Sequence, residues 1–145
     1  MDTLLTATEI SNYRQILPDD ESSQKVLATL EKYDGRFDDS FDELLSMGGE
    51  AKTFDLERLR KVTLKQLRQE VCGDDSFRTK VQEYSKNPGS APLLNGLIGS
   101  LVLLSNAHGI PLESTIATIA VLYILKIGLN VLCEYTEATD DDSAL

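Results

Sequence analysis

The sequence has no tryptophan, only 6% aromatic residues, a single histidine and two cysteines. Scarce aromatics predict an aliphatic core, and the absence of interleaved aromatic and basic residues gives no platform for stacking nucleic-acid bases. His108 has no cysteine or second histidine at a ligand spacing, so we expect no metal site. The chain also lacks a glycine-rich phosphate loop and a nucleophile elbow. We therefore expect a protein that is not an enzyme and has no cofactor.

The two cysteines, Cys72 and Cys133, lie far apart and form no CxxC pattern. This usage is typical of free thiols in a reducing compartment. The first residues are acidic and lack the basic segment and long apolar stretch of a signal peptide. The sequence therefore predicts two free thiols and a cytoplasmic protein.

The net charge of −10 is unevenly distributed along the chain. Residues 1–50 carry 4 basic and 12 acidic residues, whereas residues 51–92 carry 9 basic and 6 acidic residues. The acidic balance opposes binding to phosphate backbones, so nucleic acid is an unlikely partner. Lys61, Lys65 and Arg68 could form a basic stripe that regulates a nucleic-acid machine, but a solvated helix face is the favoured interpretation.

The C-terminal third contains two apolar runs, Leu93–Ala107 and Ile116–Cys133, separated by a short break that contains Pro111. Between Leu93 and Cys133 the only charged residues are Glu113 and Lys126. A helix that is apolar on all sides is either buried in a bundle or inserted in a membrane. This hairpin must therefore be covered by the chain itself, by a partner or by lipid.

Two observations favour burial within the chain over a membrane hairpin. The first run would span only about 22 Å as a helix, short of a hydrocarbon core of about 30 Å. Lys126 in the second run would cost roughly 2.5–3.5 kcal/mol at the centre of a membrane span. Gly96 and Ser100 lie one turn apart in the first run, where another helix could approach closely.

The N-terminal segment is punctuated as three short helices. Thr6 and Glu9 have the spacing of a capping box, and Pro18 ends the first helix. A second helix is predicted over residues 23–33, ended by Gly35 in a left-handed C-cap conformation. A third helix is predicted over residues 38–46, where aspartates favour the N-terminal end.

These three helices resemble the UBA/CUE family of small helical modules. The resemblance rests on Leu27-x-x-Leu30, on Asp34-Gly35-Arg36-Phe37, on Phe41-x-x-Leu44-Leu45 and on a Leu17-Pro18 pair in the first loop, where CUE modules have Phe-Pro. In that family the loop and the terminal di-leucine form an apolar patch that docks a partner, commonly ubiquitin. The resemblance implies the following partner-binding residues: Ile16, Leu17, Pro18, Leu44 and Leu45. The alternative is that these leucines pack the protein's own core.

The middle of the chain supplies a cover for the apolar hairpin. Gly48-Gly49 indicates a linker at residues 47–53. Residues 54–86 then carry three short amphipathic patterns, one of them opened by a second capping-box candidate at Thr63. We expect an all-α fold, with a three-helix UBA-like module at 1–46 and a helical bundle at 54–135 built on the apolar hairpin. The acidic residues 136–145 are predicted to be a disordered tail.

The leading functional hypothesis is an adaptor or accessory factor that binds another protein. It would use the UBA/CUE-like patch, the surface of the helical bundle, or both. The alternative is a membrane-associated or membrane-inserting protein that acts through residues 92–135. Self-association through an uncovered apolar face is a third option, because exposed apolar patches usually bind a partner.

Overall fold

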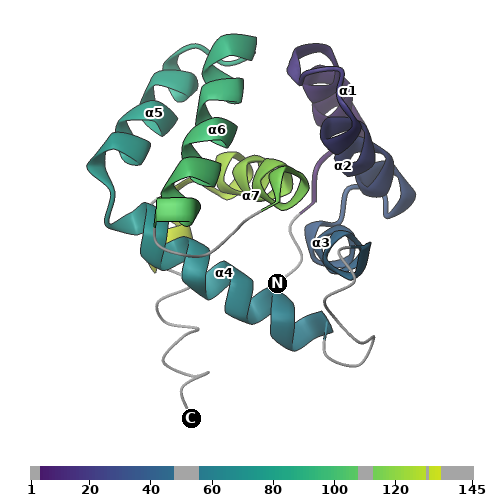
Figure 1. The fold of residues 1–145 in the computed structure, drawn as a ribbon. Coiled ribbons are helices and arrows are strands. Elements are labelled where there is room, and N and C mark those ends of the chain that lie inside the picture. The colour runs from purple at the N-terminus through teal and green to yellow at the C-terminus, as the bar shows by residue number, and fades with distance from the viewer. Residues whose placement is uncertain (1–3, 48–55, 108–112, 130, 135–145) are drawn as a thin grey trace.

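The computed structural model describes residues 4–47, 56–107, 113–129 and 131–134, and shows the all-α fold that the sequence predicts (Figure 1). The predicted linker beyond Met47 and the predicted tail lie outside these residues. The helices are α1 (Ala7–Ile16), α2 (Glu21–Lys32), α3 (Phe37–Met47), α4 (Leu56–Cys72), α5 (Asp75–Lys86), α6 (Ala91–Ala107) and α7 (Ser114–Ile127). None of the described helices combines the length and apolar character needed to cross a membrane.

The helices are arranged around α7. In Figure 1, α1 and α2 stand on one side, α5 and α6 stand on the other, and α7 lies between the two pairs. Helices α3 and α4 lie below them, packed against each other. Helix α7 packs directly against α2, α3 and α6, so it contacts both the N-terminal helices and the first half of the apolar hairpin.

Helix α7 is buried along most of its length, which confirms the buried interpretation of the second apolar run. Its buried residues are Ile116, Ala117, Thr118, Ile119, Ala120, Val121, Leu122 and Ile124. The Thr118 hydroxyl donates to the Ser114 carbonyl at 2.7 Å, so this buried polar group has a partner. Lys126 lies in the last turn, because Gly128 ends the helix at a φ of 89°. Its ammonium group therefore reaches the surface.

The N-terminal helices share one hydrophobic core with the rest of the chain. Leu27 and Leu30 of α2 and Phe41 of α3 belong to the same buried cluster as α7 and α6. The ring of Phe37 meets the ring of Tyr123 edge to face, with centroids 5.3 Å apart. Such a contact contributes about 0.5–1.5 kcal/mol beyond area burial. The predicted units 1–46 and 54–135 are thus joined through α7 in the structure.

The predicted capping box is present at the start of α1. The Thr6 side chain accepts from the Glu9 backbone N–H at 3.1 Å, and the Glu9 carboxylate accepts from the Thr6 N–H at 2.9 Å, as in a capping box. Asp20 and Asp74 cap α2 and α5 in the same way, each accepting from the backbone N–H three residues on. The second capping box, at Thr63, is wrong, because α4 runs unbroken through it. No glycine or proline interrupts the sequence from Leu56 to Cys72.

The end of α2 differs from the predicted cap by one residue. Asp34 takes the first left-handed position after the helix, with a φ of 55°, and Gly35 follows it with a φ of 85°. The Gly35 N–H donates to the Leu30 carbonyl at 2.7 Å and the Asp34 N–H to the Glu31 carbonyl at 3.2 Å, which is the Schellman pattern. Gly35 is needed for a second reason. Its carbonyl accepts from the Leu5 N–H at 2.9 Å, and a Cβ on Gly35 would lie 1.9 Å from the Leu5 oxygen.

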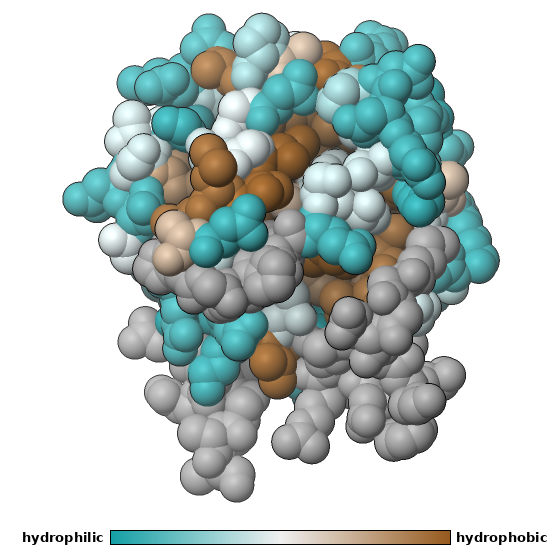
Figure 2. Space-filling view, in the orientation of Figure 1, coloured by the Kyte–Doolittle hydropathy of each residue, from teal (hydrophilic) through white to brown (hydrophobic). Residues whose placement is uncertain are grey.

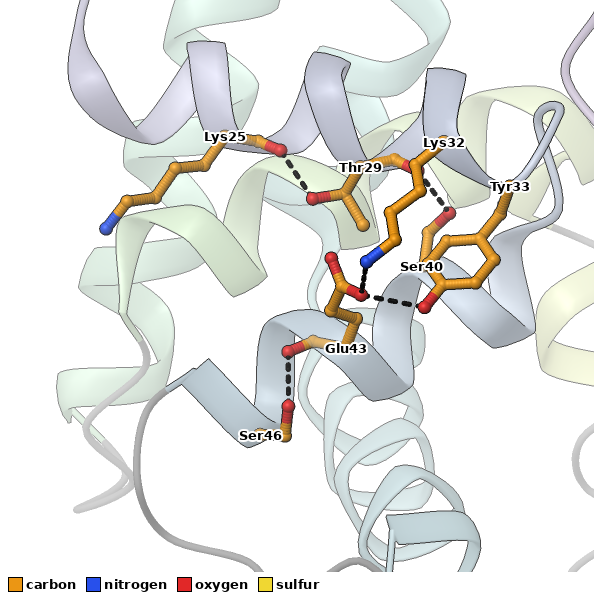
Figure 3. A network of polar contacts seen from close by, with 7 residues as sticks. All are labelled: Lys25, Thr29, Lys32, Tyr33, Ser40, Glu43 and Ser46. Atoms are coloured by element: carbon orange, nitrogen blue, oxygen red, sulfur yellow. Dashed lines mark hydrogen bonds and ion pairs between the residues drawn. The ribbon is translucent and has the colours of Figure 1, made fainter.

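Polar contacts fix α3 against α2 (Figure 3). The Glu43 carboxylate accepts from the Lys32 ammonium at 2.6 Å and from the Tyr33 hydroxyl at 2.7 Å. These two hydrogen bonds hold the pKa of Glu43 below its usual value. Buried Ser40 donates to the Thr29 carbonyl at 3.4 Å, so its hydroxyl also has a partner. The contacts position α3 where it can cover α7.

The prediction of two free thiols is wrong. Cys72, the last residue of α4, and Cys133 form a disulfide whose Cα atoms are 5.9 Å apart. The bond ties α4 to the segment after α7, across 61 residues of sequence. Helix packing brings the two cysteines together, which no local pattern could show. The cytoplasmic assignment therefore loses the support that free thiols gave it, since disulfides persist mainly in oxidising compartments.

The disulfide should contribute measurably to stability. For a closed loop of 61 residues, the chain-entropy argument gives about 4 kcal/mol, so reduction should lower the free energy of unfolding by that order. Urea denaturation with and without reductant measures the difference, with thiol titration to verify reduction. The Cys72→Ser/Cys133→Ser double variant is the control and should not respond to reductant. A wild-type midpoint that reductant leaves unchanged would contradict this role.

Gly35→Ala should destabilise the protein far more than Gly128→Ala. Both glycines have φ near 85–89°, but only at Gly35 would a Cβ meet backbone, whereas nothing lies within 4 Å at Gly128. Gly128→Ala should therefore cost the roughly 1–2 kcal/mol of left-handed strain, and Gly35→Ala should exceed it. Thermal and urea unfolding of the two variants gives the comparison. Equal losses of unfolding free energy in the two variants would show that the close approach of Gly35 to Leu5 does not affect stability.

Candidate functional site

An apolar groove lies between α6 and the start of α2, with the first turns of α7 as its floor. We call it the α6 groove. It has a volume of about 440 Å³. Figure 2 shows it as a brown, apolar depression bordered by white and teal residues. The groove is lined by Pro18, Asp20, Ser22, Ser23, Asn95, Ile98, Gly99, Val102, Leu103, Ser114 and Thr118.

Helix α6 supplies the apolar wall of the groove. The helix contains no charged residue, and its inner face, including Leu97 and Leu101, is fully buried. Its outer face carries Leu103, which is 70% exposed, beside half-buried Val102 and Ile98. A single exposed leucine needs no explanation, but these three side chains form a continuous apolar strip along one wall.

The small residues of α6 leave open space along this wall. A Cβ added to Gly99 or Gly96 would meet nothing within 4 Å. The sequence indicated that another helix could approach closely at Gly96 and Ser100, but in the described residues nothing lies within 4 Å of a Cβ placed on Gly96. The space beside Gly99 belongs to the groove and is unfilled by the described part of the chain.

Acidic residues lie at or next in sequence to the lining opposite α6, where Asp20 borders the groove. Asp19, Asp20 and Glu21 at the start of α2 are exposed, and so is Glu113 at the start of α7. Asp20 caps α2, whereas Glu113 makes no side-chain capping bond. Lys25 lies 3.2 Å from Glu21 and compensates one of these charges. The rim therefore keeps a negative balance next to an apolar wall.

A hydrogen bond between Ser22 and Ser114 closes the floor of the groove. The two hydroxyl oxygens are 2.7 Å apart and join α2 to α7. Both residues border the groove, so its shape depends on how these two helices meet. Since α7 packs against both α2 and α6, the floor and the α6 wall are joined through the core.

A second hollow, of about 600 Å³, lies between α1 and α5. Tyr13 and Tyr84 line it, and burial raises the pKa of Tyr13. At its edge the Lys126 ammonium lies 2.9 Å from the Glu9 carboxylate, which ties α1 to α7. Partial burial raises the pKa of Glu9, but hydrogen bonds from Lys126 and Thr6 outweigh it, so the net pKa is lowered. This hollow is more polar than the α6 groove, and the Glu9–Lys126 ion pair lies at its edge.

The five residues implied by the UBA/CUE resemblance do not share one exposed surface. Leu17 and Leu44 are 7% and 2% exposed and belong to the core, as the alternative interpretation had it. Pro18 lines the α6 groove, whereas half-buried Ile16 lines the hollow between α1 and α5. Half-buried Leu45 lies in α3, which packs against α4 and α7. Of the five, only Pro18 therefore borders the α6 groove.

No group of three or more histidine, cysteine, aspartate or glutamate residues that could hold a metal ion occurs in the described ranges. Comparison with known protein families, with curated proteins and with solved structures found no match. The UBA/CUE resemblance of residues 1–46 therefore stays a prediction that rests on the residues quoted for it. The α6 groove was not predicted, although the absence of charge from this 17-residue helix could be read from the sequence.

Proposed function

We propose that the protein is a non-enzymatic interaction module whose α6 groove takes an apolar segment of a partner protein. The observation that carries this proposal is the uncharged outer face of α6, with Leu103 70% exposed above an unfilled groove. Exposure of such an apolar strip to water is unfavourable. A partner that covers it would gain binding free energy, because burying one leucine contributes about 1.5–3 kcal/mol.

The surroundings of the groove have the character of a protein-binding site. Interfaces between proteins commonly have an apolar centre depleted in charge and a polar rim. Here Ile98, Val102 and Leu103 form the centre, and the acidic residues at the start of α2 form part of the rim. Pro18, from the predicted patch, would contact the partner at one end. The other four residues of that patch would not.

The membrane alternative has less support at this site. An apolar strip could enter a lipid surface, but the acidic rim beside it would be repelled by anionic headgroups. The net charge of −10 acts in the same direction over a longer range. A protein partner satisfies both the apolar wall and the rim, so it is the function we favour.

Leu103→Asp should weaken partner binding without unfolding the protein. The variant places a carboxylate where the partner's apolar residues would dock, and loss of one buried leucine corresponds to about ten- to hundredfold weaker binding. Val62→Asp on α4 is the matched control, because Val62 is also exposed, at 44%, and lies away from the groove. Wild-type protein would first be used to recover and identify partners from the native cells. Each purified partner would then be titrated against wild type, Leu103→Asp and Val62→Asp.

Circular dichroism and thermal unfolding would verify that both variants remain folded. The proposal predicts weaker binding for Leu103→Asp alone. Equal affinity of every purified partner for wild type and Leu103→Asp would show that the α6 groove is not the binding site.

A further inference from the structure

We propose that the segment bound in the α6 groove is a cationic amphipathic helix of the partner protein. This inference rests on the proposed function and adds the chemistry of what is bound. It follows from the shape of the α6 wall and from the negative charge of the rim. The same charge also argues against a second copy of this chain as the occupant.

The α6 wall has the surface that a second helix packs against. Ile98 and Val102 are one turn apart and form a ridge, and Gly99 makes a gap beside that ridge. Helices pack by placing the ridges of one between the ridges of the other, at interaxial distances of about 8–10 Å. The missing side chain at Gly99 lets the partner backbone come close there. The described part of this chain offers no sheet edge to which an extended peptide could add a strand.

The rim sets the charge of the incoming helix. Asp20 lines the groove on the side opposite α6. Asp19, Glu21 and Glu113 are exposed carboxylates that adjoin lining residues in sequence, and Lys25 pairs with one of them, Glu21. An apolar helix flanked by lysine or arginine would place its cations against this rim while its leucines face Ile98 and Leu103. Electrostatic complementarity of this kind selects partners by charge and accelerates association.

The same rim argues against a second copy of this chain. A two-fold interface sets each surface patch against itself. Pairing α6 with α6 of another copy would bring the acidic starts of α2 and α7 from both copies close together. Because like charges in contact disfavour association, the occupant should carry the opposite sign.

Designed peptides test the inference directly against the full-length protein. The first is a labelled 18-residue helix with leucines at i, i+3, i+4 and i+7 and lysines on both flanks. The second replaces each lysine with glutamate, and the third scrambles the lysine peptide so that no apolar face remains. Fluorescence anisotropy at low and high salt gives the affinities, and sedimentation reports any self-association.

We expect the lysine helix to bind, and the glutamate and scrambled peptides to bind at least about tenfold more weakly. Leu103→Asp should weaken binding of the lysine helix by about ten- to hundredfold, and Val62→Asp should leave it unchanged. The rim variant Asp19→Asn/Glu21→Gln/Glu113→Gln should weaken it by about tenfold, and added salt should weaken it as well. Asp20 is kept because it caps α2.

Three results would overturn the inference. Leu103-dependent binding of the glutamate helix with equal affinity would reject the charge preference but leave the proposed function intact. Binding of the lysine helix that ignores Leu103→Asp, or no binding of any peptide by folded protein, would count against the inference and the groove together. A dimer, or binding to phosphatidylserine vesicles, that Leu103→Asp abolishes would replace the helix with a second copy or a lipid surface.

Discussion

The burial of α7 is the constraint on which the rest of the structure depends. A helix that is apolar on all sides must be covered on all sides, and this one is covered by α2, α3 and α6. Its five large buried aliphatic residues, two of them Ile119 and Leu122, together stabilise the fold by on the order of 10 kcal/mol, as an upper estimate from area burial. This term is comparable to the whole net stability of a domain, so the N-terminal helices and the apolar hairpin fold as parts of one core.

The groove is a consequence of how α7 is covered. Helix α6 has to be apolar on its inner face, where Leu97 and Leu101 are fully buried. Helices α2 and α6 approach α7 from different sides, and they leave the first turns of α7 as a floor between them. The outer face of α6 faces water but carries no charged residue. The start of α2 supplies carboxylates on the opposite side of the groove. The same arrangement that completes the core thus creates a surface suited to a partner helix.

Several local features of the fold, though not the helix start predicted at Thr63, could be predicted from the sequence, and contacts between distant segments could not. The capping box at Thr6, the end of the first helix at Pro18 and the burial of the second apolar run follow from short-range rules, and the structure has all three. The burial of Leu17 and Leu44 depends on neighbours elsewhere in the chain, and so does the disulfide between Cys72 and Cys133. The absence of charge from α6 could be read from the sequence, but which face of α6 stays uncovered depends on neighbours elsewhere in the chain.

Hydrogen exchange of the backbone amides, followed by mass spectrometry on the intact, oxidised protein, tests the central claim most directly. If α7 is the shared centre of one core, its amides should exchange slowest, and protection of α2, α3 and α6 should be lost together with that of α7 in a single cooperative opening. Faster exchange in α7 than in α1 would contradict this account. So would protection of α1 to α3 that persists after α7 has exchanged, because residues 1–46 would then form a core of their own.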